Sequence, residues 1–82
     1  MLNMEINTKL SQKDACNAVK SFFGIGGLGL QLDQEGPDCL SFTGGGGFVN
    51  ASICCSLEGK TQIQFESREW ERQVKAFAEK YA

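Results

Sequence analysis

Apolar and polar residues alternate with a period of two at the start of this chain. The apolar positions are Leu2, Met4, Ile6 and Leu10, and Thr8 occupies the remaining place on their side. The polar positions between them are Asn3, Glu5, Asn7 and Lys9. Successive side chains of a strand point to opposite faces of a sheet, which produces this period. The segment is therefore predicted to be a strand with one buried and one solvated face.

The same alternation predicts four further strands. Leu28–Asp33 is the second, and Leu40 and Phe42 mark a short third strand. In the fourth strand one face carries Val49, Ala51, Ile53, Cys55 and Leu57. Glu58-Gly59 is typical of a tight hairpin turn, and the returning fifth strand carries Thr61, Ile63 and Phe65. Polar residues separate the apolar ones in these strands, so the sheet is expected to have one solvated face.

The run of four glycines, Gly44, Gly45, Gly46 and Gly47, is predicted to be a flexible loop between the third and fourth strands. Glycine loses more conformational entropy on folding than other residues, so four in succession favour a mobile connection. They are either a simple hairpin link or a place where a ligand approaches the backbone closely. Phe48 follows them directly, on the face expected to be solvated, and an exposed aromatic residue beside such a loop is typical of a contact site.

Two segments have helical periodicity. Ser11 is suited to the N-cap of the first helix, with Asp14 in the first turn. Its apolar stripe is Ala15, Val19, Phe22 and Phe23, and Gly24 is expected to end it in the left-handed conformation. The second helix is predicted to follow an N-cap at Ser67 and to run from Arg68 to Tyr81. Its stripe contains Trp70, Val74, Phe77, Ala78 and Tyr81.

The order of elements is thus β-α-β-β-β-β-α. It predicts an α+β fold in one small domain, residues 1–82, with a curved antiparallel sheet of about five strands. The long C-terminal helix packs on one face of that sheet.

Composition and charge exclude several classes of function. The formal net charge is −2 and the basic residues are scattered, which disfavours nucleic acid as a partner. No apolar run approaches the roughly 20 residues that span a bilayer, so no membrane partner is expected. The first six residues lack the basic and apolar regions of a signal peptide, and a cytoplasmic location is expected.

The four cysteines are expected to be reduced thiols, several of them small buried apolar side chains. They are Cys16, Cys39, Cys54 and Cys55, and no pair has the CxxC spacing. Without histidine, a zinc site would need all four thiolates to converge, so no metal and no cofactor are predicted.

Catalysis is not expected either. The chain has no histidine to act as a general base near neutral pH or to activate a serine or cysteine nucleophile.

Residues 24–29 match the G-x-G-x-x-G pattern of dinucleotide-binding folds. That motif binds pyrophosphate because a strand precedes the loop and a helix N-terminus follows it. Here the expected order is reversed, so the segment is predicted to be a simple helix-to-strand connection.

Three features together resemble a small version of the helix-grip superfamily, which includes START domains, Bet v 1-like plant proteins and polyketide cyclases. A first strand leads directly into a helix between Met4 and Phe23, the glycines at 44–47 join two strands, and a long apolar helix follows Arg68. The resemblance implies a ligand cavity between the sheet and the final helix. Superfamily members are usually much longer, with a second early helix and more strands.

Two functions follow from these expectations. The first is a non-catalytic binding module that holds a small apolar ligand between the sheet and the C-terminal helix, with the glycine loop as its gate. The expected lining residues are Leu40, Phe42, Val49, Ile53, Ile63, Phe65, Trp70, Val74 and Phe77. The alternative is a structural or interaction protein with a filled core that forms homodimers. It would pair through a sheet edge, either the first strand or Leu28–Asp33.

Overall fold

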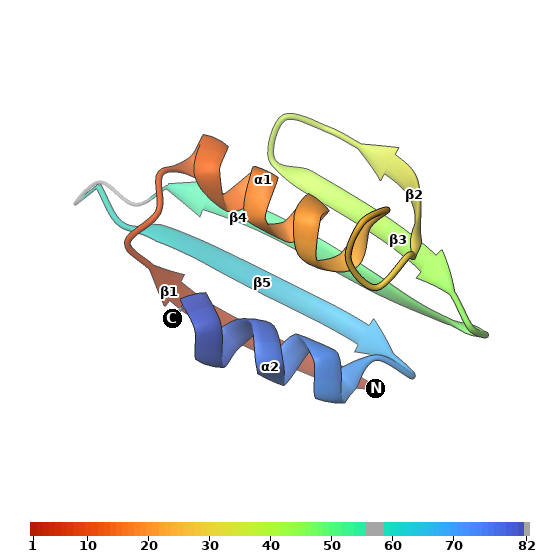
Figure 1. Cartoon of the computed structure of the whole chain (residues 1–82). Helices are drawn as coiled ribbons and strands as arrows, with labels where there is room; N and C mark the ends of the chain where they lie inside the picture. The colour runs from red at the N-terminus through yellow and green to blue at the C-terminus, as the bar shows by residue number, and fades with distance from the viewer. Residues whose placement is uncertain (56–58, 82) are drawn as a thin grey trace.

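Seven elements follow one another along the chain, and their order confirms the predicted α+β architecture (Figure 1). The computed structural model describes residues 1–55 and 59–81. The elements are β1 (Leu2–Thr8), α1 (Gln12–Phe23), β2 (Gln31–Glu35), β3 (Cys39–Gly44), β4 (Gly47–Cys55), β5 (Thr61–Arg68) and α2 (Glu71–Tyr81). The predicted positions of Ser56, Leu57 and Glu58 lie outside the described residues.

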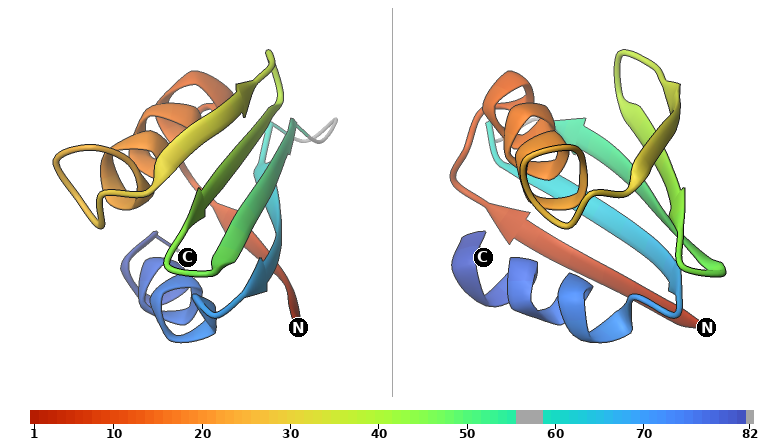
Figure 2. Two further views of the ribbon diagram at one scale, coloured as in Figure 1. Left: turned by 90° about the vertical axis from the view of Figure 1, so that its right-hand side faces the viewer. Right: turned by 45° about the vertical axis from the view of Figure 1, so that its right-hand side comes forward.

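The strands form one antiparallel sheet in the order β1-β5-β4-β3-β2. Strands β2 to β5 pair with their neighbours in sequence, and β1 joins the last strand, from Leu2 opposite Ser67 to Thr8 opposite Thr61. Both helices lie on the same face of the twisted sheet (Figure 2). Helix α1 packs against β3 and β4, and α2 packs against β5 and β1.

The strand register gathers the apolar positions on the helix face. Ile6 lies opposite Ile63, which lies opposite Ile53, and all three are buried. On the other face the equivalent row is Glu5, Gln64 and Ser52. The pattern of two therefore predicted correctly which face of β1, β4 and β5 is covered and which is open, because in a regular strand the face of a side chain depends only on its position. In β2 the prediction is wrong, since every residue is exposed, including Leu32, which the alternation placed on the buried face.

Helix α1 begins as predicted. The Ser11 Oγ atom accepts a hydrogen bond of 3.1 Å from the backbone N–H of Asp14, which satisfies one of the unpaired amides of the first turn. The prediction for the other end is wrong in one respect. Gly24 has φ −86°, so it does not adopt the left-handed conformation, and its N–H donates to the carbonyl of Lys20.

Helix α2 begins at Glu71, three residues after the predicted start at Arg68, and Ser67 is not its N-cap. Ser67 is fully buried in β5, where its Oγ donates to the carbonyl of Phe48 at 3.1 Å. Pairing with β1 and β4 holds the chain extended as far as Arg68. Glu69, at φ +72°, then turns the chain into the helix, and its N–H donates to the Glu71 carboxylate.

The loop predicted at the four glycines is shorter than expected. Gly44 and Gly47 pair with each other inside β3 and β4, and only Gly45 and Gly46 form the turn. These two have φ values of +58° and +82°. A two-residue hairpin turn with positive φ at both positions matches the twist of the strands and favours glycine. The indole N–H of Trp70 donates to the Gly44 carbonyl at 2.9 Å, which ties α2 to this hairpin.

The second strand also starts later than predicted. Leu28 and Leu30 precede β2, which begins at Gln31. The N–H groups of Leu28 and Leu30 donate instead to the carbonyls of Phe22 and Phe23 at the end of α1. Closing the helix end takes precedence over continuing the strand, since those carbonyls have no partner within the helix.

Candidate functional site

The nine residues expected to line a ligand site do lie together, between the sheet and the helices. Eight of them are at most 2% exposed and belong to the hydrophobic core. They are Leu40, Phe42, Val49, Ile53, Ile63, Phe65, Val74 and Phe77. Trp70 is half-buried at the edge of this core. Alpha helix α1 adds Ala15, Val19 and Phe23 to the same cluster.

Aromatic rings fill the centre of this layer. The ring of Phe77 lies 5.3 Å from that of Phe65, 5.8 Å from that of Phe23 and 5.4 Å from that of Phe22, centroid to centroid. These are the ordinary distances of packed aromatic pairs. Side chains of the protein itself therefore occupy the layer in which the sequence predicted a ligand.

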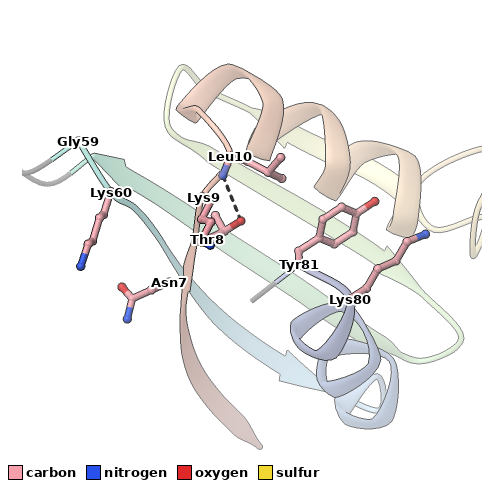
Figure 3. A pocket seen from close by; sticks show the side chains of 8 residues that line it. All are labelled: Asn7, Thr8, Lys9, Leu10, Gly59, Lys60, Lys80 and Tyr81. Carbon is pink, nitrogen blue, oxygen red and sulfur yellow. Dashed lines mark hydrogen bonds between the residues drawn. The ribbon is translucent and has the colours of Figure 1, made fainter.

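A different hollow lies at the surface, where three distant parts of the chain meet. It encloses about 640 Å³ and is lined by residues 7–10 at the end of β1, by residues 59–60 before β5 and by residues 80–81 at the end of α2 (Figure 3). The side chains of Leu10 and Tyr81 are directed into the space beneath α1. Both are half-buried and pack against the core, so they provide the hollow with an apolar wall.

Local structure holds the β1 side of this hollow in place. Thr8 is buried, and its Oγ1 accepts a hydrogen bond of 3.3 Å from the backbone N–H of Leu10. This bond fixes the bend by which the chain leaves β1, and so it sets the direction of the Leu10 side chain. On the opposite side, Tyr81 is positioned by Phe77, whose ring centroid lies 4.6 Å from that of Tyr81.

Lysines give the hollow a positive rim. Lys9, Lys60 and Lys80 line it, which is three of the eight basic residues in a chain of net charge −2. They do not converge on one point: Lys60 and Lys80 project toward opposite sides in Figure 3. The Lys80 Nζ atom lies 5.5 Å from the centroid of the Tyr81 ring, a cation–π distance. The three lysines are therefore spread around the hollow and do not converge to bind a single small ion.

A smaller hollow adjoins the first and shares two of its residues. It encloses about 260 Å³, and Lys80 and Tyr81 line it together with Phe22 and Leu28. Leu28 lies in the connection between α1 and β2 and is 39% exposed. Tyr81 thus stands between two hollows, with apolar side chains on both sides of its ring.

Sequence reasoning missed this site, because Lys9, Lys60 and Lys80 lie far apart along the chain. The available signal was indirect. Pairing of the first strand with the last would have placed residues 7–10 beside residues 59–61, and the final helix was already predicted to lie over them. Strand order was not part of the prediction, so the three lysines could not be grouped.

The cysteines do not form a site. All four are free thiols; Cys39, Cys54 and Cys55 are exposed, and Cys16 is half-buried. The expectation that several are fully buried is therefore wrong. Cys55 faces the helix side as predicted, but it is exposed at the end of β4. Its Sγ lies 3.8 Å from Oε1 of Gln12, the first residue of α1.

Burial raises the pKa of the Cys16 thiol, and Glu35, Asp38 and Cys39 act in the same direction, while Lys20 opposes them. A thiol held in its protonated form is a weak nucleophile. Among residues 1–55 and 59–81, no group of three or more histidine, cysteine or acidic side chains is placed to hold a metal ion.

The glycine-rich segment 24–29 has a helix before it and a strand after it, as predicted. Its amides point back toward the helix: Gly27 and Gly29 donate to the carbonyl of Gly24, and Leu28 donates to that of Phe22. A Cβ atom at Gly27 would lie 2.3 Å from the Phe22 carbonyl oxygen, so this position requires glycine for close approach. The segment closes the helix and does not offer its amides to a phosphate.

Within the described part of the chain, neither helix has the length and apolar character needed to cross a membrane. Comparisons of the sequence with protein-family models and with curated proteins, and of the structure with solved structures, find no match.

Proposed function

We propose that the protein is a non-catalytic binding module whose ligand is an amphipathic anion, and that this ligand binds in the surface hollow beside Tyr81. The observation that carries the proposal is the composition of the hollow, which combines an apolar wall at Leu10 and Tyr81 with a lysine rim. The ligand of the predicted binding module is thus proposed to bind at the surface and not in the core. The chain has no histidine, so the proposal includes no acid–base chemistry.

The size of the hollow supports a small-molecule ligand. Pockets for small molecules usually measure about 300–1,000 Å³, with mostly apolar walls and a few polar groups that orient the ligand. The hollow, at about 640 Å³, falls in this range. An apolar ligand body would pack on Tyr81 and Leu10, and its anionic group would reach Lys9 or Lys80 at the rim.

The charge of the ligand follows from the rim. Lys9 and Lys80 are exposed side chains, so each ion pair would be weak, about 0.2–1 kcal/mol, and screened by salt. Apolar contact must therefore provide most of the affinity, and the lysines select for negative charge. An anion without an apolar body is expected to bind much more weakly than one with it.

The test uses the fluorescent probe anilinonaphthalene sulfonate and its uncharged analogue N-phenylnaphthylamine. The expected result is that Lys80→Gln weakens binding of the sulfonate by about threefold at low salt, and leaves binding of the uncharged probe unchanged. Tyr81→Ala is expected to weaken binding of both probes. Lys75→Gln, an exposed position on α2 that borders neither hollow, is the matched control.

Equal effects of Lys80→Gln and Lys75→Gln on the sulfonate would reject the site, because they would show only a general dependence on charge. Chemical shifts of backbone amides during the titration give an independent readout. The proposal requires the largest shifts at residues 8–10 and 80–81. Shifts centred on Val49, Ile63 or Phe77 would instead place the ligand in the core.

A further inference from the structure

The sheet has two outer strands, β1 and β2, and they differ in how well they could accept another strand. A strand at a sheet edge presents a row of backbone N–H and C=O groups without partners, which favours pairing with a further strand. Proteins block such pairing with bulges, charges, short strands or proline. Comparing the two edges shows which one this protein leaves open.

Strand β2 has several of these blocking features. It has five residues, and its pairing with β3 shifts register between Leu32 and Gln34, which leaves Asp33 as a bulge. The Asp33 carboxylate accepts a hydrogen bond of 2.8 Å from the Thr43 hydroxyl, which holds the bulge in place. Glu35 forms an ion pair with Lys20 of α1 at the end of the strand. This edge is short, irregular and acidic.

Strand β1 has none of these blocking features apart from the charge of Glu5. Its seven residues pair with β5 in unbroken register and include no proline or glycine. Helix α2 packs against both β1 and β5, on the face of the sheet that it shares with α1 (Figure 2). In the described part of the chain, no other strand lies beside this edge.

We propose that β1 pairs with β1 of a second copy of this chain, antiparallel and across a two-fold axis, so that the two sheets become continuous. Two-fold symmetry pairs a surface with itself, so the strand must be complementary to its own reversed sequence. This requirement limits the register. A dimer centred on Glu5 would place two Glu5 carboxylates directly opposite each other, and like charges in that position are destabilising.

A dimer centred on Ile6 avoids this repulsion and keeps every side chain on its own face. Met4 then lies opposite Thr8 of the second copy, and Glu5 lies opposite Asn7, all of them within β1. Met4 is half-buried in the single chain, and the second copy would cover it further.

Charge supports the same register. Lys9 directly follows the last residue of β1, so in this register Lys9 of the second copy lies diagonally across from Glu5; diagonal neighbours in a sheet are about 7–8 Å apart, which a lysine side chain can span. Symmetry repeats this attraction, so each dimer contains it twice. The complementarity between Glu5 and Lys9 is the argument that the occupant of this edge is a second copy and not an unrelated strand.

The experiment is sedimentation equilibrium of the protein without ligand, which makes its outcome independent of the proposed anion site. Wild type is expected to dimerise, and Glu5→Lys is expected to raise the dimer dissociation constant at least tenfold at low salt. Glu66→Lys is the matched control. It makes the same charge change on the same face of the neighbouring interior strand β5, at the position opposite Asn3. It is expected to leave the dissociation constant within about twofold of wild type.

A mixture provides the decisive comparison. Glu5→Lys and Lys9→Glu chains are each expected to be monomeric when alone, because each brings like charges together across the axis. Mixed in equal amounts, they are expected to form a heterodimer. Positions 5 and 9 are then both lysine in one chain and both glutamate in the other, so opposite charges face each other across the axis. Recovery of the dimer in the mixture also shows that both variants are folded.

Three results would overturn the proposal. The first is a wild-type protein that stays monomeric at every concentration studied. The second is equal weakening of the dimer by Glu5→Lys and Glu66→Lys. The third is a dimer that Leu32→Lys disrupts and Glu5→Lys does not, which would assign the pairing to β2.

Discussion

Replacement of Phe77 by alanine tests whether the layer between the sheet and the helices is a filled core. Phe77 is fully buried on α2, and its ring contacts those of Phe22, Phe23, Phe65 and Tyr81. Truncation to alanine removes these contacts and leaves a cavity that its rigid surroundings fill only in part.

The expected loss is large compared with the stability of the whole protein. Phenylalanine-to-alanine changes in packed cores cost about 3–5 kcal/mol. A domain of 82 residues has a free energy of unfolding of about 4–12 kcal/mol. The Phe77→Ala variant is therefore expected to be marginally stable, with a measurable unfolded fraction at 25 °C if the wild-type value lies at the low end of that range.

Urea unfolding followed by tryptophan fluorescence measures this loss. The chain has a single tryptophan, Trp70, which bridges α2 and the β3–β4 hairpin, so its emission reports on the integrity of both. With a urea m-value of about 1 kcal/mol/M, the midpoint is expected to fall by about 3 M or more. Ile25→Ala is the control, because Ile25 is 95% exposed and its truncation is expected to change stability by less than about 0.5 kcal/mol.

A loss below about 1 kcal/mol for Phe77→Ala would refute the reasoning. It would mean that the ring is not closely packed, and that the layer has room for a ligand as the sequence first suggested. Phe77→Leu provides a graded test, since a smaller change of volume is expected to cost roughly half as much or less.

Four further predictions concern local interactions. Ser11→Ala is expected to lower the free energy of unfolding by about 1 kcal/mol through loss of the α1 N-cap, and Ser11→Asp, which retains a cap, is expected to be close to wild type in urea unfolding. Trp70→Phe is expected to lower the free energy of unfolding by about 1 kcal/mol because it removes the hydrogen bond to the Gly44 carbonyl. The backbone amides of Gly45 and Gly46 are expected to exchange faster with solvent in this variant; unchanged exchange rates would contradict the role of Trp70 in holding the hairpin. Iodoacetamide at mildly alkaline pH is expected to label Cys54 before Cys16, as read by peptide mass spectrometry, because Cys54 is exposed whereas burial raises the pKa of Cys16. A raised pKa means that the folded protein holds the Cys16 proton more tightly than the unfolded chain does. The stability that the protonated thiol contributes is therefore present below the ordinary thiol pKa and is lost as the pH rises through the raised value. Between neutral and high pH, the urea midpoint of Cys16→Ala is accordingly expected to fall less than that of wild type.

Features that depend on neighbouring residues were predictable from the sequence. The alternation at Leu2, Met4 and Ile6 predicted both a strand and its buried face, because the period of two is a property of the extended backbone itself. Ser11 identified the start of α1, since an N-cap acts on amides only two or three residues away. The apolar spacing of Val74 and Phe77 predicted which side of the last helix is buried.

The errors arose where a distant part of the chain competes for the same residue. Ser67 has the sequence context of a helix cap, but pairing with β1 and β4 keeps it in a strand, and its hydroxyl donates to Phe48. Leu28 continues an alternating pattern, but its N–H is needed to close the end of α1. In both cases a hydrogen bond made elsewhere overrides the local preference.

The candidate site belongs entirely to the tertiary structure. Leu10 and Tyr81 lie at opposite ends of the sequence, and they meet only because β1 pairs with β5 and α2 turns back over both strands. The same arrangement decided which apolar residues became core and which remained at the surface. The alternation of residues thus determined which way each side chain of a strand points, because that depends on the local backbone, whereas long-range strand pairing and helix placement determined what each side chain meets there.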